Sequence, residues 1–239
     1  MKLGFDSKRL FSNFTGLGNY SRTLLKNLAD FYPNNGYSLY TPKLKETSTE
    51  TSFFITNKNY NAFISKSPIK SYWRSFSIVN QLKRDKIELY HGLSNELPFN
   101  IHKSGIKSIV TIHDLIFKHY PNTYPAFDRK IYDLKFKASC KNATRVIAIS
   151  NSTKNDIVNF YGISADKIDV VYQSCSPIYY QLQDQHQVDT VTKEYNLPNK
   201  YLLFVGSVEK RKNLKVIIEA YKHLTQELRI PLVIVGKPR

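Results

Sequence analysis

The run Ser108-Ile109-Val110-Thr111-Ile112-His113, followed at once by Asp114, is the clearest indication of the fold class. It is short, rich in β-branched residues and closed by polar side chains, which is typical of a buried strand in a parallel sheet. Similar runs recur along the chain and alternate with amphipathic segments, a pattern that indicates βα units. We predict strands at residues 2–6, 37–40, 53–56, 87–91, 108–113, 145–150, 168–172, 201–205 and 232–235.

Three helices are predicted where apolar residues repeat every three or four positions. They lie after Gly18, before the strand at 145–150 and after residue 213. Residues 41–50 are predicted to form a polar surface loop. The apolar faces of the helices consist of Tyr20, Leu24, Leu28 and Phe31; of Tyr124, Phe127, Ile131, Leu134 and Ala138; and of Leu214, Ile217, Ile218, Tyr221 and Leu224.

A polar, Gln-rich stretch between residues 177 and 199 separates two parts of the chain. We predict a Rossmann-like domain over residues 1–180, and over 181–239 a linker followed by the first βαβ unit of a second Rossmann-like domain. A parallel sheet needs helices on both faces and more than two strands. The second domain is therefore expected to be incomplete in this sequence.

Composition narrows the class of protein. The 239 residues hold 35 Lys and Arg against 19 Asp and Glu, a net charge of +16, which favours nucleotide diphosphates, acidic lipid headgroups or nucleic acid as partners. No run approaches the ~20 apolar residues of a membrane span, and the polar start is unlike a signal peptide. We therefore expect a cytoplasmic protein. Cys140 and Cys175 lack disulfide or metal-ligand spacing and are expected to be ordinary thiols.

Polar residues follow the predicted strands at the edge where open parallel sheets bind ligands. A structural alternative exists for each of them: Asp114 and Ser150 suit helix N-caps, and a lone histidine is often a hydrogen-bonded core residue. Their convergence at one edge favours a functional role. The residues are His91, Asn95, His113, Asp114 and Ser150.

Two loops have features that suit an anion. Gly16 and Gly18 stand between the first strand and the first helix, where a bare backbone and a helix start suit a phosphate. Gly206 ends a later strand and is followed by three consecutive cations, Lys210, Arg211 and Lys212, before a helix. A helix start disfavours cations, so this cluster indicates an anionic ligand, the alternative being a solvated turn.

Five motifs follow one another in a fixed order. They are Gly16-Leu-Gly-Asn-Tyr-Ser-Arg-Thr-Leu-Leu25, Thr111-Ile-His-Asp-Leu115, Val146-Ile-Ala-Ile-Ser150, Val170-Val-Tyr172 and Val205-Gly-Ser-Val-Glu-Lys-Arg-Lys-Asn-Leu214. Their order and spacing resemble glycosyltransferase family 4, a family of retaining enzymes with the α/β GT-B fold. The resemblance covers nearly the whole chain.

The resemblance implies roles for single residues of the first domain. Gly16 and Gly18 would lie near the reacting sugar and the donor phosphates. The family's His-Asp pair corresponds to His113 and Asp114, which are expected to be catalytic, and His113 would contact the transferred sugar. His91, Asn95 and Ser150 are expected on the acceptor side.

In the second loop, the resemblance implies that Arg211 and Lys212, after Gly206, hold the donor diphosphate. Many relatives carry an arginine where this chain has Ser207. Arg211 and Lys212 would therefore supply more of the charge that stabilises the leaving phosphate.

The resemblance implies transfer of a hexose, with mannose the leading candidate, from a nucleotide-diphosphate sugar to a polysaccharide or lipid-linked acceptor, with retention. Lysine and arginine can neutralise the diphosphate and no Asp-x-Asp motif is present, so no metal or other cofactor is expected. Because the donor domain is predicted to be incomplete, this chain alone is expected to be inactive.

The helix predicted before residue 145 carries residues that bear on contact with a lipid-linked acceptor. Tyr132 and Phe136 lie opposite its predicted apolar face, with Arg129 and Lys135 nearby. They could contact acidic lipid headgroups on the inner face of the plasma membrane, or be buried against a neighbouring loop.

Two other classes of function remain open. A nucleic-acid-binding module would explain the charge, but no recognised motif presents it with stacking aromatics, so no nucleic-acid partner is expected. A non-catalytic scaffold or regulatory subunit would keep the fold and need a partner for the donor half.

Overall fold

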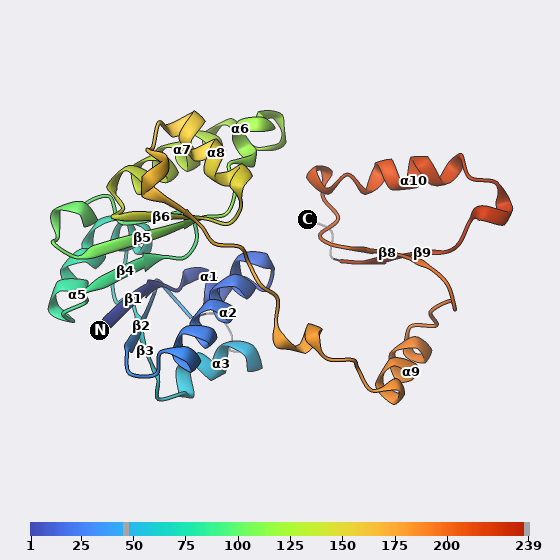
Figure 1. Ribbon diagram of the computed structural model, residues 1–239, viewed down its shortest axis with the longest axis horizontal. Coiled ribbons are helices and arrows are strands. Elements are labelled where there is room, and N and C mark those ends of the chain that lie inside the picture. Colours follow the sequence, from blue (N-terminus) through green and yellow to red (C-terminus); the bar gives the residue numbers. More distant parts are fainter. Residues whose placement is uncertain (45–47, 237–239) are drawn as a thin grey trace. The chain divides into compact units, whose positions relative to one another are not determined.

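The computed structural model describes residues 1–44 and 48–236, and of Arg211 it describes the backbone alone. This part of the chain forms two compact units, the first spanning Met1–Ser176 and the second beginning at Pro177 (Figure 1). The first contains a large parallel sheet and the second a two-stranded one.

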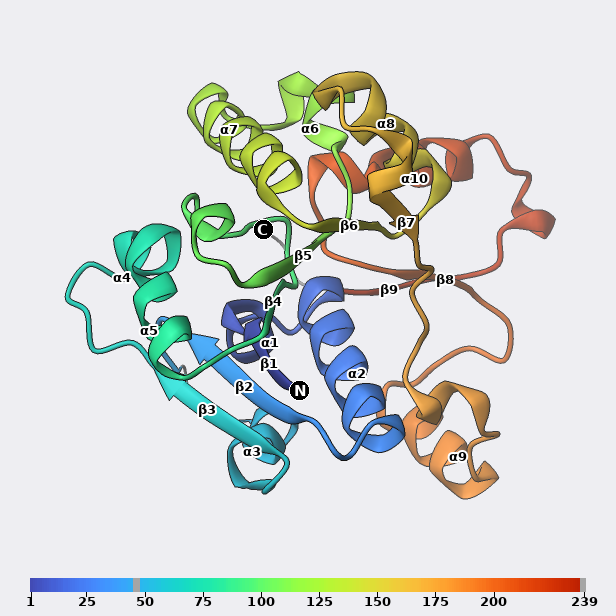
Figure 2. The ribbon, with the colours of Figure 1, turned by 60° about the vertical axis from the view of Figure 1, so that its left-hand side comes forward.

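The sheet of the first unit has seven strands, all parallel to their neighbours. They are β1 (Lys2–Asp6), β2 (Gly36–Thr41), β3 (Tyr60–Ile64), β4 (Leu89–Gly92), β5 (Lys107–Ile112), β6 (Arg145–Ala148) and β7 (Ile168–Val170). Figure 2 shows their order, β3-β2-β1-β4-β5-β6-β7. The order reverses between β1 and β4, and ligands of open α/β sheets bind outside the carboxyl ends of the strands at such a point.

Helices cover both faces of this sheet. They are α1 (Lys8–Ser12), α2 (Gly16–Phe31), α3 (Thr49–Thr56), α4 (Lys70–Tyr72), α5 (Ile78–Arg84), α6 (Ile116–His119), α7 (Ala126–Asn142) and α8 (Asn151–Tyr161). A π-helical segment lies at η1 (Trp73–Ser77), and 3-10 turns lie at η2 (Ile101–Lys103), η3 (Pro121–Thr123) and η4 (Ala165–Lys167). One buried cluster contains Leu25 and Leu39, and a second contains Tyr40 and Leu82. Leu39 and Tyr40 are consecutive in β2, so the clusters lie on opposite faces. The predicted α/β class with a Rossmann-like sheet is confirmed.

One predicted strand is wrong. Residues 53–56 belong to helix α3, and the strand that follows it and pairs with the outer side of β2 is β3, at Tyr60–Ile64. A short apolar run fits a strand and a buried helix equally well. Thr51 and Phe54, three positions apart, are the buried residues of α3.

The predicted loop is also shorter, because Thr41 ends β2 and Thr49 begins α3, while residues 45–47 lie outside the described part.

The predicted apolar face of α7 is wrong as well. Phe127 and Leu134 are 73% and 65% exposed, whereas Phe136 and Cys140 are buried. Tyr132 stacks on Phe136, with ring centroids 5.8 Å apart. Because α7 has apolar residues on several sides, the helical period left two choices of face.

The second unit is a small β–α–β arrangement. Its elements are η5 (Pro177–Tyr180), α9 (Gln185–Glu194), β8 (Leu202–Val205), η6 (Lys210–Lys212), α10 (Leu214–Lys222), η7 (Gln226–Leu228) and β9 (Leu232–Val235). The segment predicted as a linker thus contains a helix, α9. Strands β8 and β9 are parallel. Among the described hydrophobic side chains of this unit, Leu214 alone is buried.

No helix within residues 1–44 and 48–236 has both the length and the apolar character needed to cross a membrane.

Candidate active site

The carboxyl edge of the large sheet brings together the polar residues predicted to lie there. Ser150 Oγ is 3.0 Å from Thr153 Oγ1, and this hydroxyl donates to the carbonyl oxygen of His113 at 3.2 Å. The His113 amide donates to Asn95 Oδ1 at 2.8 Å. Hydrogen bonds therefore link Ser150, His113 and Asn95 after three successive strands.

Asn95 and Ser150 also have evident structural tasks. Asn95 has a φ of +65°, in the left-handed region that asparagine tolerates. Ser150 caps helix α8 by accepting a hydrogen bond from the Thr153 amide at 3.1 Å. The N-cap alternative for Ser150 is therefore present in the structure, beside its place in the cluster.

His91 lies in a second chain of hydrogen bonds. Its Nε2 is 2.8 Å from Thr111 Oγ1, which is 2.9 Å from the hydroxyl of Tyr20. Burial, reinforced by the nearby His113, lowers the pKa of His91 to about 3. His91 is therefore neutral at physiological pH. The chain connects β4, β5 and helix α2, so His91 stabilises this edge of the sheet.

His113 is held at both ring nitrogens. Its Nε2 donates to the carbonyl oxygen of Leu93 at 2.9 Å, and its Nδ1 lies 2.9 Å from Gln173 Nε2. The ring of Tyr20 meets it edge-on, with centroids 4.8 Å apart. Burial lowers the pKa of His113, although the Leu93 carbonyl and Asp114 oppose this shift. His113 is thus a neutral, oriented imidazole.

Asp114 differs from its neighbour because it is exposed. Its Oδ1 accepts a hydrogen bond from the Ile116 amide at 3.2 Å, which holds the start of α6. Exposure leaves this carboxylate accessible to a ligand at the edge of the sheet.

The two loop glycines are not equivalent. A Cβ on Gly16 would meet nothing within 4 Å, so the backbone there is open to a ligand. A Cβ on Gly18 would lie 1.7 Å from the carbonyl oxygen of Asn13. Gly18 is therefore required for the packing of its own loop.

In the second unit the three predicted cations occupy η6 (Lys210–Lys212), called the basic turn below. Asn213, with a φ of +51°, separates this turn from helix α10. Lys210 and Lys212 are exposed, and the side chain of Arg211 is outside the described part. The Gly206 amide, before the turn, donates to the Val235 carbonyl at 2.9 Å.

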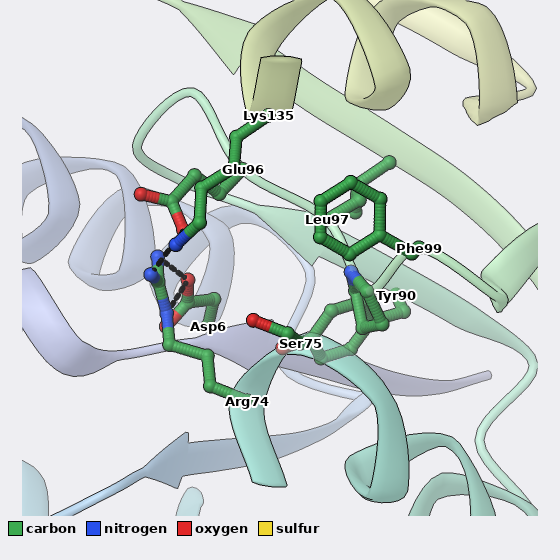
Figure 3. Close-up of a pocket in the computed structure, with 9 residues that line it drawn as sticks. Asp6, Arg74, Ser75, Tyr90, Glu96, Leu97, Phe99 and Lys135 are labelled. Atoms are coloured by element: carbon green, nitrogen blue, oxygen red, sulfur yellow. Dashed lines mark hydrogen bonds and ion pairs between the residues drawn. The ribbon is translucent and has the colours of Figure 1, made fainter. Parts of the chain in front are cut away.

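A buried ion network was not predicted from the sequence. Arg74 of η1 binds both Asp6, at the end of β1, and Glu96, after β4, while Lys135 of α7 reaches Glu96 at 3.1 Å (Figure 3). Burial alone would lower the pKa of Arg74. The negative charges of Asp6 and Glu96 outweigh this effect, so the pKa of Arg74 is raised.

The cavity beside this network measures only about 10 Å³, room for about one water molecule. The network therefore ties elements together at the switch point rather than binding a sugar. Asp6 was visible as a polar residue ending a strand, but Arg74 lies in an aromatic segment without a motif.

Comparison with known proteins gives one family. The model described as Glycosyltransferase Family 4 matches residues 14–175. O-antigen chain mannosyltransferase B of Escherichia coli is 24% identical over 251 residues, covering 99% of this chain and 64% of the relative. O-antigen chain mannosyltransferase RfbU of Salmonella typhimurium is 24% identical over 196 residues, covering 81% of this chain and 47% of the relative. The chain thus spans less than two thirds of these relatives.

Among solved structures, Anabaena Alr3699/HepE in complex with UDP is similar over 100% of this chain and 62% of its own, with a TM-score of 0.65 at 12% identity. A glycosyltransferase from Rickettsia africae matches 98% of this chain with a TM-score of 0.58. This likeness confirms the predicted GT-B type of fold.

Proposed function

Since the chain belongs to glycosyltransferase family 4, we propose that the protein transfers a hexose, mannose in the first instance, from a nucleotide-diphosphate sugar to a polysaccharide or lipid-linked acceptor. The family match over residues 14–175 carries this proposal. The mannosyltransferase relatives favour mannose, and the neighbour that binds UDP favours a nucleotide-diphosphate donor.

The basic turn is proposed to hold the donor diphosphate. Lys210 and Lys212 are exposed, so each can approach a phosphate without losing a partner inside a core. Gly206 precedes them with a backbone that a ligand can approach closely. As the sugar leaves, negative charge grows on the diphosphate, and cations aimed there stabilise the transition state more than the ground state.

The reaction is proposed to retain the configuration of the sugar. The bond between the anomeric carbon and the diphosphate oxygen breaks, and its electron pair stays on that oxygen. The acceptor hydroxyl forms the new bond on the same face and passes its proton to the leaving phosphate. Lysine and arginine charge suffices for this departure, and we propose that no metal or other cofactor takes part.

The first unit is proposed to orient the reacting sugar and the acceptor. Gly16 leaves open backbone at the start of α2, Asp114 is an exposed acceptor, and His113 is a neutral imidazole at the same sheet edge. Gly16 and Asp114 can contact hydroxyl groups directly, whereas His113, with both ring nitrogens occupied, orients the groups around it.

We propose that the protein contacts an anionic membrane through α7. The face of α7 proposed for this contact differs from the face that the sequence indicated. Phe136 is buried, and Lys135 is bound to Glu96. The exposed residues Phe127, Lys130 and Leu134 combine apolar and cationic groups that suit the headgroup region of the inner leaflet. The protein would then act at the cytoplasmic face of the membrane.

The test is transfer of labelled sugar from GDP-mannose, UDP-glucose and related donors to lipid-linked oligosaccharides. In a protein with a complete donor domain, we expect turnover with a mannose donor and a loss of about 10²-fold or more in the double variant Arg211→Ala/Lys212→Ala. Lys193→Ala/Lys200→Ala removes the same charge from exposed positions of the second unit and should transfer normally. Equal losses in both double variants would contradict the role of the basic turn.

A further inference from the structure

The protonation of His113 follows from its partners. A carbonyl oxygen only accepts hydrogen bonds, so the 2.9 Å contact with Leu93 O places the proton on Nε2. In the neutral ring, Nδ1 then carries a lone pair and accepts. Its partner at 2.9 Å is Gln173 Nε2, which donates. Both nitrogens of His113 are therefore occupied by the protein itself.

The imidazole is also poorly placed to reach a substrate. His113 is 7% exposed, its Nε2 is directed to the backbone of Leu93, and the ring of Tyr20 covers one side. The Nδ1 is covered by the Gln173 carboxamide. No ring atom of His113 able to hydrogen-bond is left for a sugar hydroxyl.

Gln173 has the opposite character. It is exposed, and it lies three residues after the end of β7, at the same carboxyl edge as His113. One N–H of its carboxamide is used by His113. Within the described residues, no hydrogen bond is found for its second N–H or its Oε1. While one N–H is bonded to His113, the Gln173 carboxamide offers one remaining donor and one acceptor side by side.

We propose that Gln173 is the residue that contacts the transferred sugar, and that His113 is a positioning residue that orients the Gln173 carboxamide. This inference rests on the proposed function. Its ligand class is a hexose with neighbouring hydroxyl groups, because one hydroxyl can donate to Oε1 while the next accepts from the second N–H. His113 contributes by fixing which face of the amide is presented, since its Nδ1 accepts only from the N–H side.

The inference is tested by NMR on the protein labelled with ¹⁵N, with the Gln173 side-chain amide identified by its loss in Gln173→Ala. We expect GDP-mannose to shift this amide while GDP alone does not. The His113 Nδ1 resonance should keep its hydrogen-bonded position throughout. Gln181→Ala, which removes an exposed glutamine of the neighbouring segment, should leave both signals unchanged.

Kinetics give a second readout. Gln173→Ala should lower kcat/KM about 10- to 100-fold, as expected for two lost hydrogen bonds. His113→Ala should lose a similar factor, and the double variant should lose no more than either single one, because both act through one amide.

Three results would overturn the inference. The first is a Gln173 amide that does not respond to a sugar nucleotide that binds. The second is loss of the hydrogen bond between Gln173 and His113 when the sugar nucleotide binds. This loss would mean that the ligand displaces Gln173 from His113. The third is additive losses in the double variant. Failure of every sugar nucleotide to bind would instead overturn the proposed function, and this inference with it.

Discussion

At the carboxyl edge of the sheet in the first unit, His91 and His113 are buried and hydrogen-bonded, whereas the lysines of the basic turn in the second unit are exposed. His91 and His113 are kept neutral, and Arg74 is locked to two carboxylates. Paired polar groups in a rigid frame provide geometry, while exposed cations provide charge. In the proposed function, the first would orient the sugar and the second would stabilise the leaving diphosphate.

The largest effect is expected from breaking the ion network of the first unit. Arg74→Met would leave Asp6 and Glu96 buried without their partner, which should lower the free energy of unfolding by about 3–5 kcal/mol. Trp73 is the single tryptophan and a neighbour of Arg74. Urea unfolding followed by its signal therefore measures the free energy of unfolding of the first unit. Arg145→Met, which breaks an exposed pair with Asp169, is the control and should unfold like the parent. Similar behaviour of the two variants would show that the network contributes little.

Acid should weaken the first unit before its carboxylates titrate. His91 has a folded pKa of about 3 against about 6.5 unfolded, so between these values the unfolded chain binds the extra proton. Stability is therefore kept above pH 6.5 and falls as the pH drops below it, by about 1.4 kcal/mol per pH unit for this group. His113 adds to the slope, since its folded pKa is lowered too. His91→Gln should flatten the dependence between pH 6.5 and 5; an unchanged slope would show that His91 is not buried as a neutral group.

The two loop glycines of the first unit are expected to differ, one being needed for packing and the other open to a ligand. Gly18→Ala places a methyl group on the Asn13 carbonyl and should cost about 1–3 kcal/mol of unfolding free energy. Gly16→Ala has open space and should leave the melting temperature nearly unchanged, while it weakens binding of the donor. Equal melting temperatures for both variants would show that the loop relaxes around Gly18.

The smallest stability effect is expected in the second unit. Lys210→Ala and Lys212→Ala remove exposed charges and should change the free energy of unfolding by less than about 0.5 kcal/mol. Affinity for GDP should nevertheless fall, and the remaining affinity should depend less on salt because fewer charges contact the phosphates. A loss of affinity with unchanged salt dependence would indicate a contact other than charge.

The sequence predicted what depends on local pattern. Short apolar runs identified β1 and β2, short β-branched runs identified β5 and β9, and the polar residues that follow strands identified the sheet edge. Local pattern could not decide α3, because its apolar run suits a helix as well as a strand. It also missed the exposed side of α7, where aromatic residues lie on several faces.

The cluster around His113 could not be predicted for another reason. Its partners Leu93 and Gln173 lie 20 and 60 positions away in the chain, so their contacts depend on sheet register and on the path after β7. Arg74 is similar: its carboxylate partners come from the ends of β1 and β4, which only the strand order places together.

Hydrogen–deuterium exchange with GDP, with GDP-mannose and without ligand tests the division of tasks between the two units most directly. We expect GDP to protect the segment from Gly206 to Leu214 alone. GDP-mannose should protect that segment and, in addition, the residues around Leu93 and Gln173 in the first unit. Protection of neither segment, or the same pattern with both ligands, would contradict the assignment of the phosphates to the basic turn and of the sugar to the sheet edge.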